Sequence, residues 1–182
     1  LSDGSLMLYD KRLGSSGSKY NAVARLKEKG DDEWIVNVHM QKMQANTIIS
    51  GNSSGIIKFW DNRYTDQSVK TIDVNDNSGT ATLTSDALLN IDENLLSGGI
   101  GGGSGYVKKS QKSCMTALAI HDYAPVMACG SNNQFIKVLN TSGETLSMIY
   151  YHDGFLGQRI GPVSSLAFHP YRMCLAAGST DS

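Results

Sequence analysis

Short runs of alternating apolar and polar residues, separated by turn residues, fill the stretch from Trp34 to Arg63. The first run, WIVNVH, ends at His39. A second run, TIIS, leads into Gly51, and a third, IIKFWD, follows a Ser/Asn/Gly turn. Three short β-rich runs with turn chemistry between them predict neighbouring strands of a small antiparallel meander.

Partial copies of this unit recur along the chain. Ten residues separate Gly51 from Asp61, and the same interval separates Gly130 from Asn140. The period is 51 residues from Asp10 to Asp61, which is near the roughly 40–45 residues of a four-stranded propeller blade. Further matched segments are 3–10 with 54–61 and 118–121 with 166–169. The repeats therefore predict an all-β chain built from blades of four-stranded antiparallel meanders.

The same alignment predicts how the chain is divided, and we expect one domain that is a fragment of a propeller. About three blades' worth of strands are present, which is fewer than the typical 4–8 blades of a closed propeller. The segment that interrupts the period is rich in glycine at 98–105, a composition typical of a flexible linker. The expected parts are 1–29 (the end of one blade), 34–74 (a complete blade), 75–113 (a flexible insert), 114–151 (a complete blade) and 163–182 (the start of the next blade).

The third and first strands of these units resemble those of the WD40 family. The resemblance is carried by the ends of the third strands, Phe59-Trp60-Asp61 and Leu8-Tyr9-Asp10, and by the histidines that end the first strands. It implies a seven-bladed β-propeller of which this chain holds about three blades. The expected structural repeat residues are Tyr9, Asp10, Trp60, Asp61, His39, His121 and His169. Asp10 and Asp61 are expected to accept backbone N–H bonds in the following turn.

Two departures from the WD40 pattern affect the hydrogen bonds expected inside the blades. Leu139-Asn140 stands where Trp-Asp is expected, and no Gly-His pair precedes any first strand. We therefore expect the family's buried His-Ser-Asp-Trp network to be incomplete.

Composition narrows the classes of partner. The net charge is −1, whereas nucleic-acid-binding domains are usually strongly basic, so no nucleic-acid partner is expected. No run of 18 apolar residues is present, so no insertion into a membrane is expected. The three cysteines lie in or beside predicted strands, which suits reduced, buried thiols in a cytoplasmic protein.

Histidines, cysteines and the Gly-rich run also allow catalytic, metal-binding and nucleotide-binding readings. However, no C-x-x-C or H-x-x-x-H spacing occurs, and the glycines at 98–105 form neither a complete G-x-G-x-x-G nor a run ending in Gly-Lys-Ser/Thr. We expect no cofactor, no metal and no enzymatic activity.

Loops at the two ends of the blades are the expected binding surfaces. The end carrying 52–54, 132–133, the insert and the 152–162 connection has the longer loops, so we expect a partner there. Candidate residues are Phe155, Gln158 and Arg159, although Phe155 could equally be buried under a folded-back loop. Arg63, at the opposite end, completes a W-D-x-R motif that resembles the one by which some WD40 proteins dock the cullin-4 ligase adaptor. Its alternative role is to pair with a neighbouring Asp.

A narrower resemblance covers the chain from Met115 onward, and more loosely before it. Tyr150-Tyr151 and DGFLGQRIGPVSSLAFHP at 153–170 resemble the last blades of the Raptor family, scaffold subunits of target-of-rapamycin (TOR) kinase complexes. The insert favours a fungal or otherwise divergent member. The resemblance implies a non-catalytic scaffold, with TOR kinase and its complex subunits as partners. It also implies a cytoplasmic location that partners can extend to the vacuolar or lysosomal surface. The alternative is a substrate receptor of a cullin-4 ubiquitin ligase.

Overall fold

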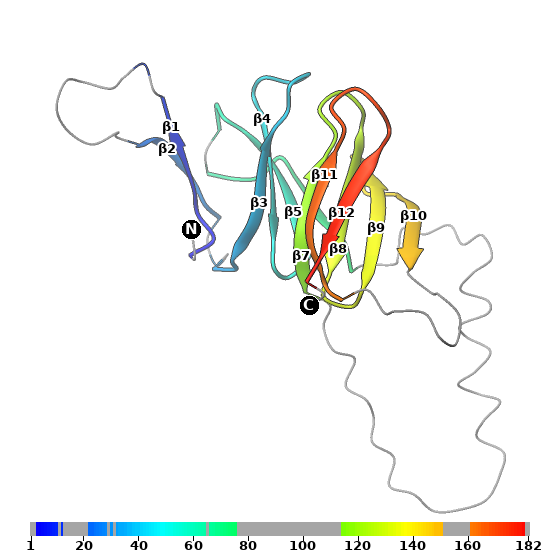
Figure 1. Cartoon of the computed structure of the whole chain (residues 1–182). Coiled ribbons are helices and arrows are strands. Elements are labelled where there is room, and N and C mark those ends of the chain that lie inside the picture. Colours follow the sequence, from blue (N-terminus) through cyan, green and yellow to red (C-terminus); the bar gives the residue numbers. More distant parts are fainter. Residues whose placement is uncertain are drawn as a thin grey trace, which may run out of the picture.

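A computed structural model describes residues 3–10, 12, 22–28, 30, 32–64, 66–75, 114–150 and 161–180. These residues form four antiparallel sheets, which we call blades one to four (Figure 1). Blade one is β1 (Leu6–Tyr9) and β2 (Ala22–Leu26). Blade two is β3 (Ile35–Met40), β4 (Thr47–Asn52), β5 (Ile56–Asp61) and β6 (Lys70–Asp73). Blade three is β7 (Met115–Ile120), β8 (Val126–Ser131), β9 (Phe135–Asn140) and β10 (Thr145–Tyr150), and blade four is β11 (Val163–Phe168) and β12 (Leu175–Ser179).

Within each sheet every strand pairs with its neighbour in the chain, so the two four-stranded sheets are the meanders that the apolar alternation predicts. The first pair of strands in blades two, three and four shows a shift of register at the same place, after its first residue. A β-bulge of this kind bends a strand and increases its twist. The repeat in the sequence is therefore also a repeat in backbone detail.

The turn between the second and third strands of a blade requires a left-handed residue. Gly55 has a φ of +86° there and Gly4 a φ of +72°, conformations that cost glycine little. In blade three Gln134 occupies the corresponding position with a φ of +66°. Gln134 is the one non-glycine residue with a positive φ in the described part of the chain.

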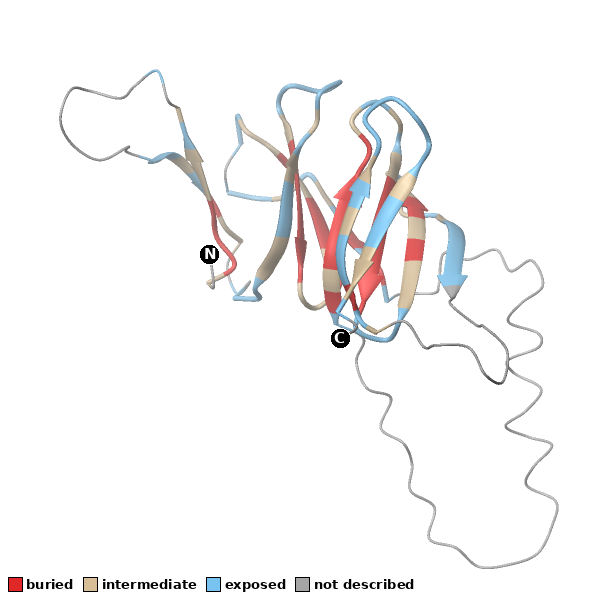
Figure 2. Cartoon of the chain, in the orientation of Figure 1, coloured by how far each residue is buried: buried red, intermediate tan, exposed pale blue. Residues whose placement is uncertain are grey.

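The core lies between the blades, where the buried parts of the strands face one another (Figure 2). Leu6 and Leu26 of blade one pack with Ile48 and Trp60 of blade two. A larger cluster joins blades two and three and contains Ile49, Ile57, Ile72, Val74, Met115, Leu118, Ile120, Met127, Cys129 and Leu139. Successive residues of β4, Ile48 and Ile49, thus enter different clusters, as strand alternation requires.

Glycines end the second strands because the next blade approaches closely there. A Cβ atom on Gly51 would lie 2.6 Å from side-chain atoms of Leu118 and Met115 in blade three. A Cβ atom on Gly130 would lie 2.5 Å from Cγ1 of Val163 in blade four. The recurring glycine of the sequence is therefore a contact position between blades.

Two buried lysines at equivalent positions of the third strands link each blade to the preceding one. Lys58 on β5 forms an ion pair with Glu28, which follows β2. Lys137 on β9 donates a hydrogen bond of 2.7 Å to the carbonyl oxygen of Val74, which follows β6. Because an unpaired buried ammonium group is costly, these bonds favour one arrangement of neighbouring blades.

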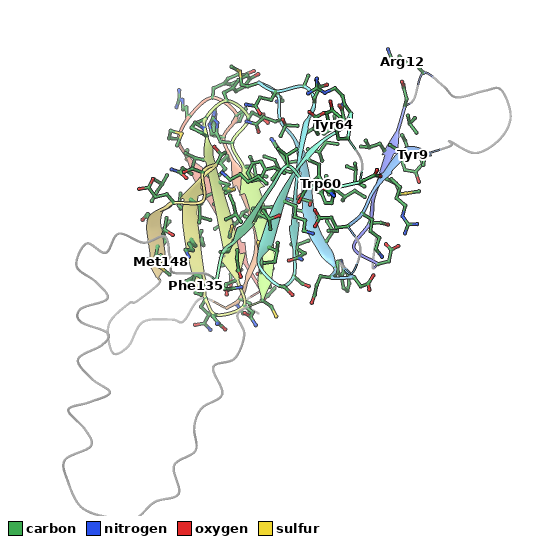
Figure 3. The ribbon with its side chains drawn as sticks, turned by 180° about the vertical axis from the view of Figure 1, so that it is seen from behind. Tyr9, Arg12, Trp60, Tyr64, Phe135 and Met148 are labelled. Atoms are coloured by element: carbon green, nitrogen blue, oxygen red, sulfur yellow. The ribbon has the colours of Figure 1, made fainter. Side chains whose placement is uncertain are left out.

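Trp60 and Tyr9 occupy equivalent positions but lie in different surroundings (Figure 3). Trp60 is 1 % exposed, and its Nε1 donates a hydrogen bond of 2.9 Å to Oγ of Ser50. Tyr9 is 57 % exposed. Blade one covers Trp60, whereas no described sheet lies on the corresponding side of blade one.

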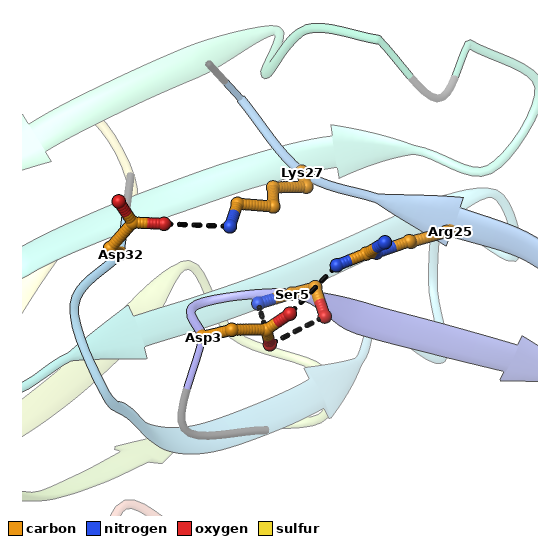
Figure 4. A network of polar contacts seen from close by, with 5 residues as sticks. All are labelled: Asp3, Ser5, Arg25, Lys27 and Asp32. Atoms are coloured by element: carbon orange, nitrogen blue, oxygen red, sulfur yellow. Dashed lines mark hydrogen bonds and ion pairs between the residues drawn. The ribbon is translucent and has the colours of Figure 1, made fainter. Parts of the chain in front are cut away.

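Polar contacts hold the ends of blade one (Figure 4). Asp3 accepts hydrogen bonds from the backbone N–H and hydroxyl of Ser5 at 3.1 and 2.7 Å, and it forms an ion pair with Arg25 at 2.7 Å. Lys27 and Asp32 form a second pair at 2.7 Å. The Ser5 hydrogen bonds and Arg25 lower the pKa of Asp3 to about 2.

The cysteines correct one expectation. Cys129 is buried, and burial raises the pKa of its thiol to about 12. Cys114 and Cys174 are exposed because they lie just before β7 and β12, outside the strands. Cys129 and Cys174 are free thiols. The described part of the chain has no helix long and apolar enough to cross a membrane.

Candidate functional site

A cavity of about 460 Å³ lies between blades two and three. We call it the inter-blade groove. Its walls come from the β3–β4 turn, the end of β5 and the start of β6 in blade two, and from residues 123–125 and Thr141 in blade three. The turns between first and second strands and between third and fourth strands meet at this end of the blades. The groove is therefore built by segments that are far apart in the sequence.

Apolar side chains line the groove and reach its rim. Ile49 is buried, and Phe59 packs against the core between the two blades. Val69 and Met43 lie nearer solvent, at 71 % and 66 % exposed, and Tyr123 is also exposed. Single exposed apolar residues are common on protein surfaces, but several around one hollow are typical of a binding site.

Two charged side chains line the groove, and their surroundings differ. Nζ of Lys70 donates a hydrogen bond of 2.9 Å to the carbonyl oxygen of Thr141 and lies 5.8 Å from the ring centre of Phe59. No carboxylate of the described residues forms an ion pair with Lys70. Asp61 is paired with Arg63, whose Nη2 lies 2.5 Å from Oδ2 of Asp61. Among the described residues that line the groove, Lys70 therefore carries a positive charge that no carboxylate neutralises.

Asp61 also holds the turn after β5. Its Oδ1 accepts a hydrogen bond of 3.0 Å from the backbone N–H of Arg63 and one of 2.9 Å from Nε. The side-chain and backbone hydrogen bonds from Arg63 lower the pKa of Asp61 to about 2. Asp10 and Arg12 repeat this arrangement in blade one. Arg63 is therefore occupied by its neighbouring Asp, although its side chain remains 64 % exposed.

A polar cluster beside the groove connects the turns of blades two and three. Lys42 of the β3–β4 turn forms an ion pair with Asp122, and Nε2 of His39 lies 3.5 Å from the same carboxylate. Burial lowers the pKa of His39, while Asp122 opposes that shift. The ring of Tyr123 stacks on Tyr171 of blade four, with ring centres 5.7 Å apart. The turns of three consecutive blades are thus in contact.

The remaining repeat histidines support turns. Nδ1 of His121 accepts hydrogen bonds from the backbone N–H groups of Tyr123 and Ala124 at 3.1 and 3.0 Å. Nδ1 of His169 accepts one of 3.1 Å from Tyr171. Among the described residues no group of three His, Cys, Asp or Glu side chains could hold a metal ion. The histidines are placed by their backbone partners, and these contacts assign them a structural role.

The sequence reasoning directed attention to a different part of the chain. Phe155, Gln158 and Arg159 lie outside the described residues. The groove lies at the end of the blades that carries the turns 41–46 and 122–125, and its Val69 and Lys70 were not among the candidates. The available signal was the grouping of 41–46 with 122–125 at one end of neighbouring blades. No sequence pattern indicated that the start of β6 would form a wall of the groove at this end.

Comparison with known proteins places these blades in context. The family model described as "WD domain, G-beta repeat" matches residues 155–182. A Dictyostelium discoideum protein named "Protein raptor homolog" is 39 % identical over all of this chain, which covers 9 % of that protein. "Regulatory-associated protein of TOR 1" from Arabidopsis thaliana is 33 % identical over 99 % of this chain and 10 % of its own length.

A solved structure shows the same fold. The crystal structure of Chaetomium thermophilum Raptor aligns with a TM-score of 0.64 and 24 % identity. The alignment covers 97 % of this chain and 13 % of that one. The present chain thus spans about a tenth of the length of the proteins that it matches.

Proposed function

We propose that this chain, which belongs to the Raptor family and carries WD40 propeller blades, is a non-catalytic scaffold that mediates protein contacts within a TOR kinase complex. The observation that carries the proposal is identity across the whole chain with proteins named as Raptor and as regulatory-associated proteins of TOR. The chain spans about a tenth of the length of those relatives. The contribution that we propose for it is therefore limited to binding surfaces for other proteins.

The described residues support this role through what they offer for binding. Buried charges are held by neighbouring blades, as Lys58 and Lys137 are. The Nδ1 atoms of His121 and His169 accept hydrogen bonds from backbone amides. What remains accessible is an apolar groove with one uncompensated lysine, together with blade-end turns. Propellers commonly present such surfaces on a rigid support, which is the property that a scaffold requires.

The test is recovery of TOR kinase from lysate with the tagged full-length protein that contains this segment. We expect TOR kinase to be recovered with the wild-type protein, and Arg63→Ala to leave that recovery unchanged because Arg63 pairs with Asp61. Absence of TOR kinase from the wild-type sample would refute the proposal. We also propose a cytoplasmic location, which imaging of the tagged protein would check.

A further inference from the structure

We infer that the inter-blade groove binds an extended segment of a partner protein that presents an apolar side chain close to a carboxylate. The inference deepens the proposed scaffold role and rests on it only for the statement that the occupant is a protein. The chemistry of the occupant follows from three separate features of the groove.

The first feature is an apolar surface shaped to receive a side chain. The cavity volume of about 460 Å³ lies in the range of roughly 300–1,000 Å³ that is usual for ligand sites. Phe59 and Ile49 form its inner part, and Val69 and Met43 bring exposed apolar groups to the rim. Removing these groups from water on binding favours an apolar anchor in the occupant.

The second feature is the charge. Lys42 is paired with Asp122 and Arg63 with Asp61, but Lys70 bonds only to a backbone carbonyl oxygen among the described groups. An ammonium group has three N–H donors, so the bond to Thr141 leaves two for an occupant. A carboxylate is the complementary partner, because charge-assisted hydrogen bonds are the stronger kind.

The third feature is an acceptor that lacks a donor. Gln41 lines the groove, and its buried Oε1 atom receives no hydrogen bond from the described residues. A buried polar atom with no partner is unfavourable. Rotation of this side chain toward the groove would offer the acceptor to a backbone N–H of the occupant. An apolar anchor, a carboxylate and an N–H donor together describe an acidic, apolar peptide.

The direct experiment uses the full-length protein and four fluorescein-labelled octapeptides in anisotropy titrations. Three peptides share a central Leu-Phe pair and carry two Asp, two Asn or two Lys beside it, and the fourth carries two Asp beside Ala-Ala. We expect the Asp/Leu-Phe peptide to bind at least about tenfold more tightly than each of the others. Equal affinity for the Asp and Asn peptides, or tighter binding of the Lys peptide, would overturn the inference.

Matched variants locate the binding. Val69→Arg fills the groove rim with a long charged side chain, and Val23→Arg makes the same change at a residue on β2 that is 56 % exposed and outside the groove lining. Lys70→Glu reverses the charge at the groove. We expect Val69→Arg and Lys70→Glu to weaken binding at least about tenfold, with Val23→Arg within about twofold of wild type. Equal effects of Val69→Arg and Val23→Arg, or full affinity in Lys70→Glu, would refute the site.

Melting temperatures of these variants show whether the fold survives. Because Val69 and Val23 are both exposed, we expect Val69→Arg to remain within about 2 °C of wild type, so that its loss of binding reports the groove. The same measurement on Lys70→Glu shows whether the variant with the reversed charge is folded.

Two further measurements separate this inference from other possibilities. Recovery of TOR kinase is measured with the wild-type protein and the same variants. Failure to recover the kinase with the wild-type protein would refute the scaffold proposal. The peptide titrations would still show whether the groove binds an acidic, apolar peptide. Residues 86–96 of this chain, DALLNIDENLL, are also acidic and apolar. We expect their removal to leave peptide affinity unchanged. A tenfold gain in affinity would mean that the chain's own segment competes, and would overturn the assignment to a partner.

Discussion

Gly130→Ala tests how closely blade four approaches blade three. The added Cβ would lie 2.5 Å from Cγ1 and 2.8 Å from Cβ of Val163, whereas carbon atoms normally approach to about 3.5–4.0 Å. Rotation of the valine side chain moves Cγ1 but leaves Cβ in place. Strand β8 or β11 must therefore shift by about 1 Å to admit the methyl group.

The size of the effect follows from this geometry. Overpacking of a core contact costs about 1–3 kcal/mol, and replacing glycine by alanine at an ordinary φ recovers about 0.4–1 kcal/mol through the unfolded state. We expect Gly130→Ala to destabilise the blade contact by about 1–2 kcal/mol. Gly51→Ala is the matched control, because its Cβ would meet only the terminal atoms Cδ2 of Leu118 and Cε of Met115 within 3 Å. Those flexible ends can rotate away, so we expect a change within about 0.5 kcal/mol of zero.

Hydrogen exchange measures the effect locally in the full-length protein, where a single unfolding transition is not assured. We expect amides of β8 and β11 to exchange about 5–30-fold faster in Gly130→Ala, as 1–2 kcal/mol requires, and amides of β4 and β7 to change less than about threefold in Gly51→Ala. Val163→Ala removes the nearest methyl group and should partly restore protection in the Gly130→Ala background. Unchanged exchange in Gly130→Ala, or strictly additive effects in the double variant, would refute the steric reasoning.

Three further changes probe the blades, each with a direct measurement. Trp60→Ala should lower the free energy of unfolding by about 3–5 kcal/mol, and an unchanged melting temperature would contradict its role in the core. Gln134→Gly should raise the melting temperature by relieving a left-handed backbone conformation that costs a non-glycine residue about 1–2 kcal/mol. A lower melting temperature would show that the Gln134 side chain stabilises the fold by more than this strain.

The third change is Glu28→Gln. Burial opposes ionisation of Glu28, but hydrogen bonds from Lys58 and Ser68 lower its pKa to about 2. Its contribution to stability is present above pH 4.5 and is lost as the pH falls toward 2, so Glu28→Gln should flatten the decline of the melting temperature between pH 4.5 and 2. A decline as steep as in wild type would exclude Glu28 as a source of the acid sensitivity.

The sequence predicted the blades well because their determinants are local and repeated. In blade two, apolar alternation marked the first three strands to within about two residues. The antiparallel pairing of β4 with β5, in which Thr47 lies opposite Asp61, agrees with the predicted meander. Asp10 and Asp61 accept hydrogen bonds from the backbone N–H two residues later, as the sequence predicted. Short-range chemistry of this kind can be derived from a single sequence.

The groove could not be derived in the same way, because no single repeat contains it. Lys70 and Val69 belong to the outermost strand of blade two, and they become part of a hollow only when Tyr123 and Pro125 of blade three stand opposite. The 47 residues between Asn75 and Tyr123 carry no signal of that juxtaposition. Tyr9 and Trp60 share a motif position but differ in exposure, because blade one covers Trp60 while no described sheet covers Tyr9.

Two lysine bonds between blades two and three hold one wall of the groove in place. Strand β6 supplies one wall, and it is tied to blade three near both ends. Lys70 at its start donates to Thr141, and Val74 just beyond its end accepts from the buried Lys137. A wall fixed at two points loses little conformational freedom when a ligand binds, and preorganisation of this kind raises affinity without adding contacts. Lys137→Met should therefore weaken binding of the acidic peptide although residue 137 does not line the groove, and an unaltered affinity would show that β6 is positioned by its strand pairing with β5 alone.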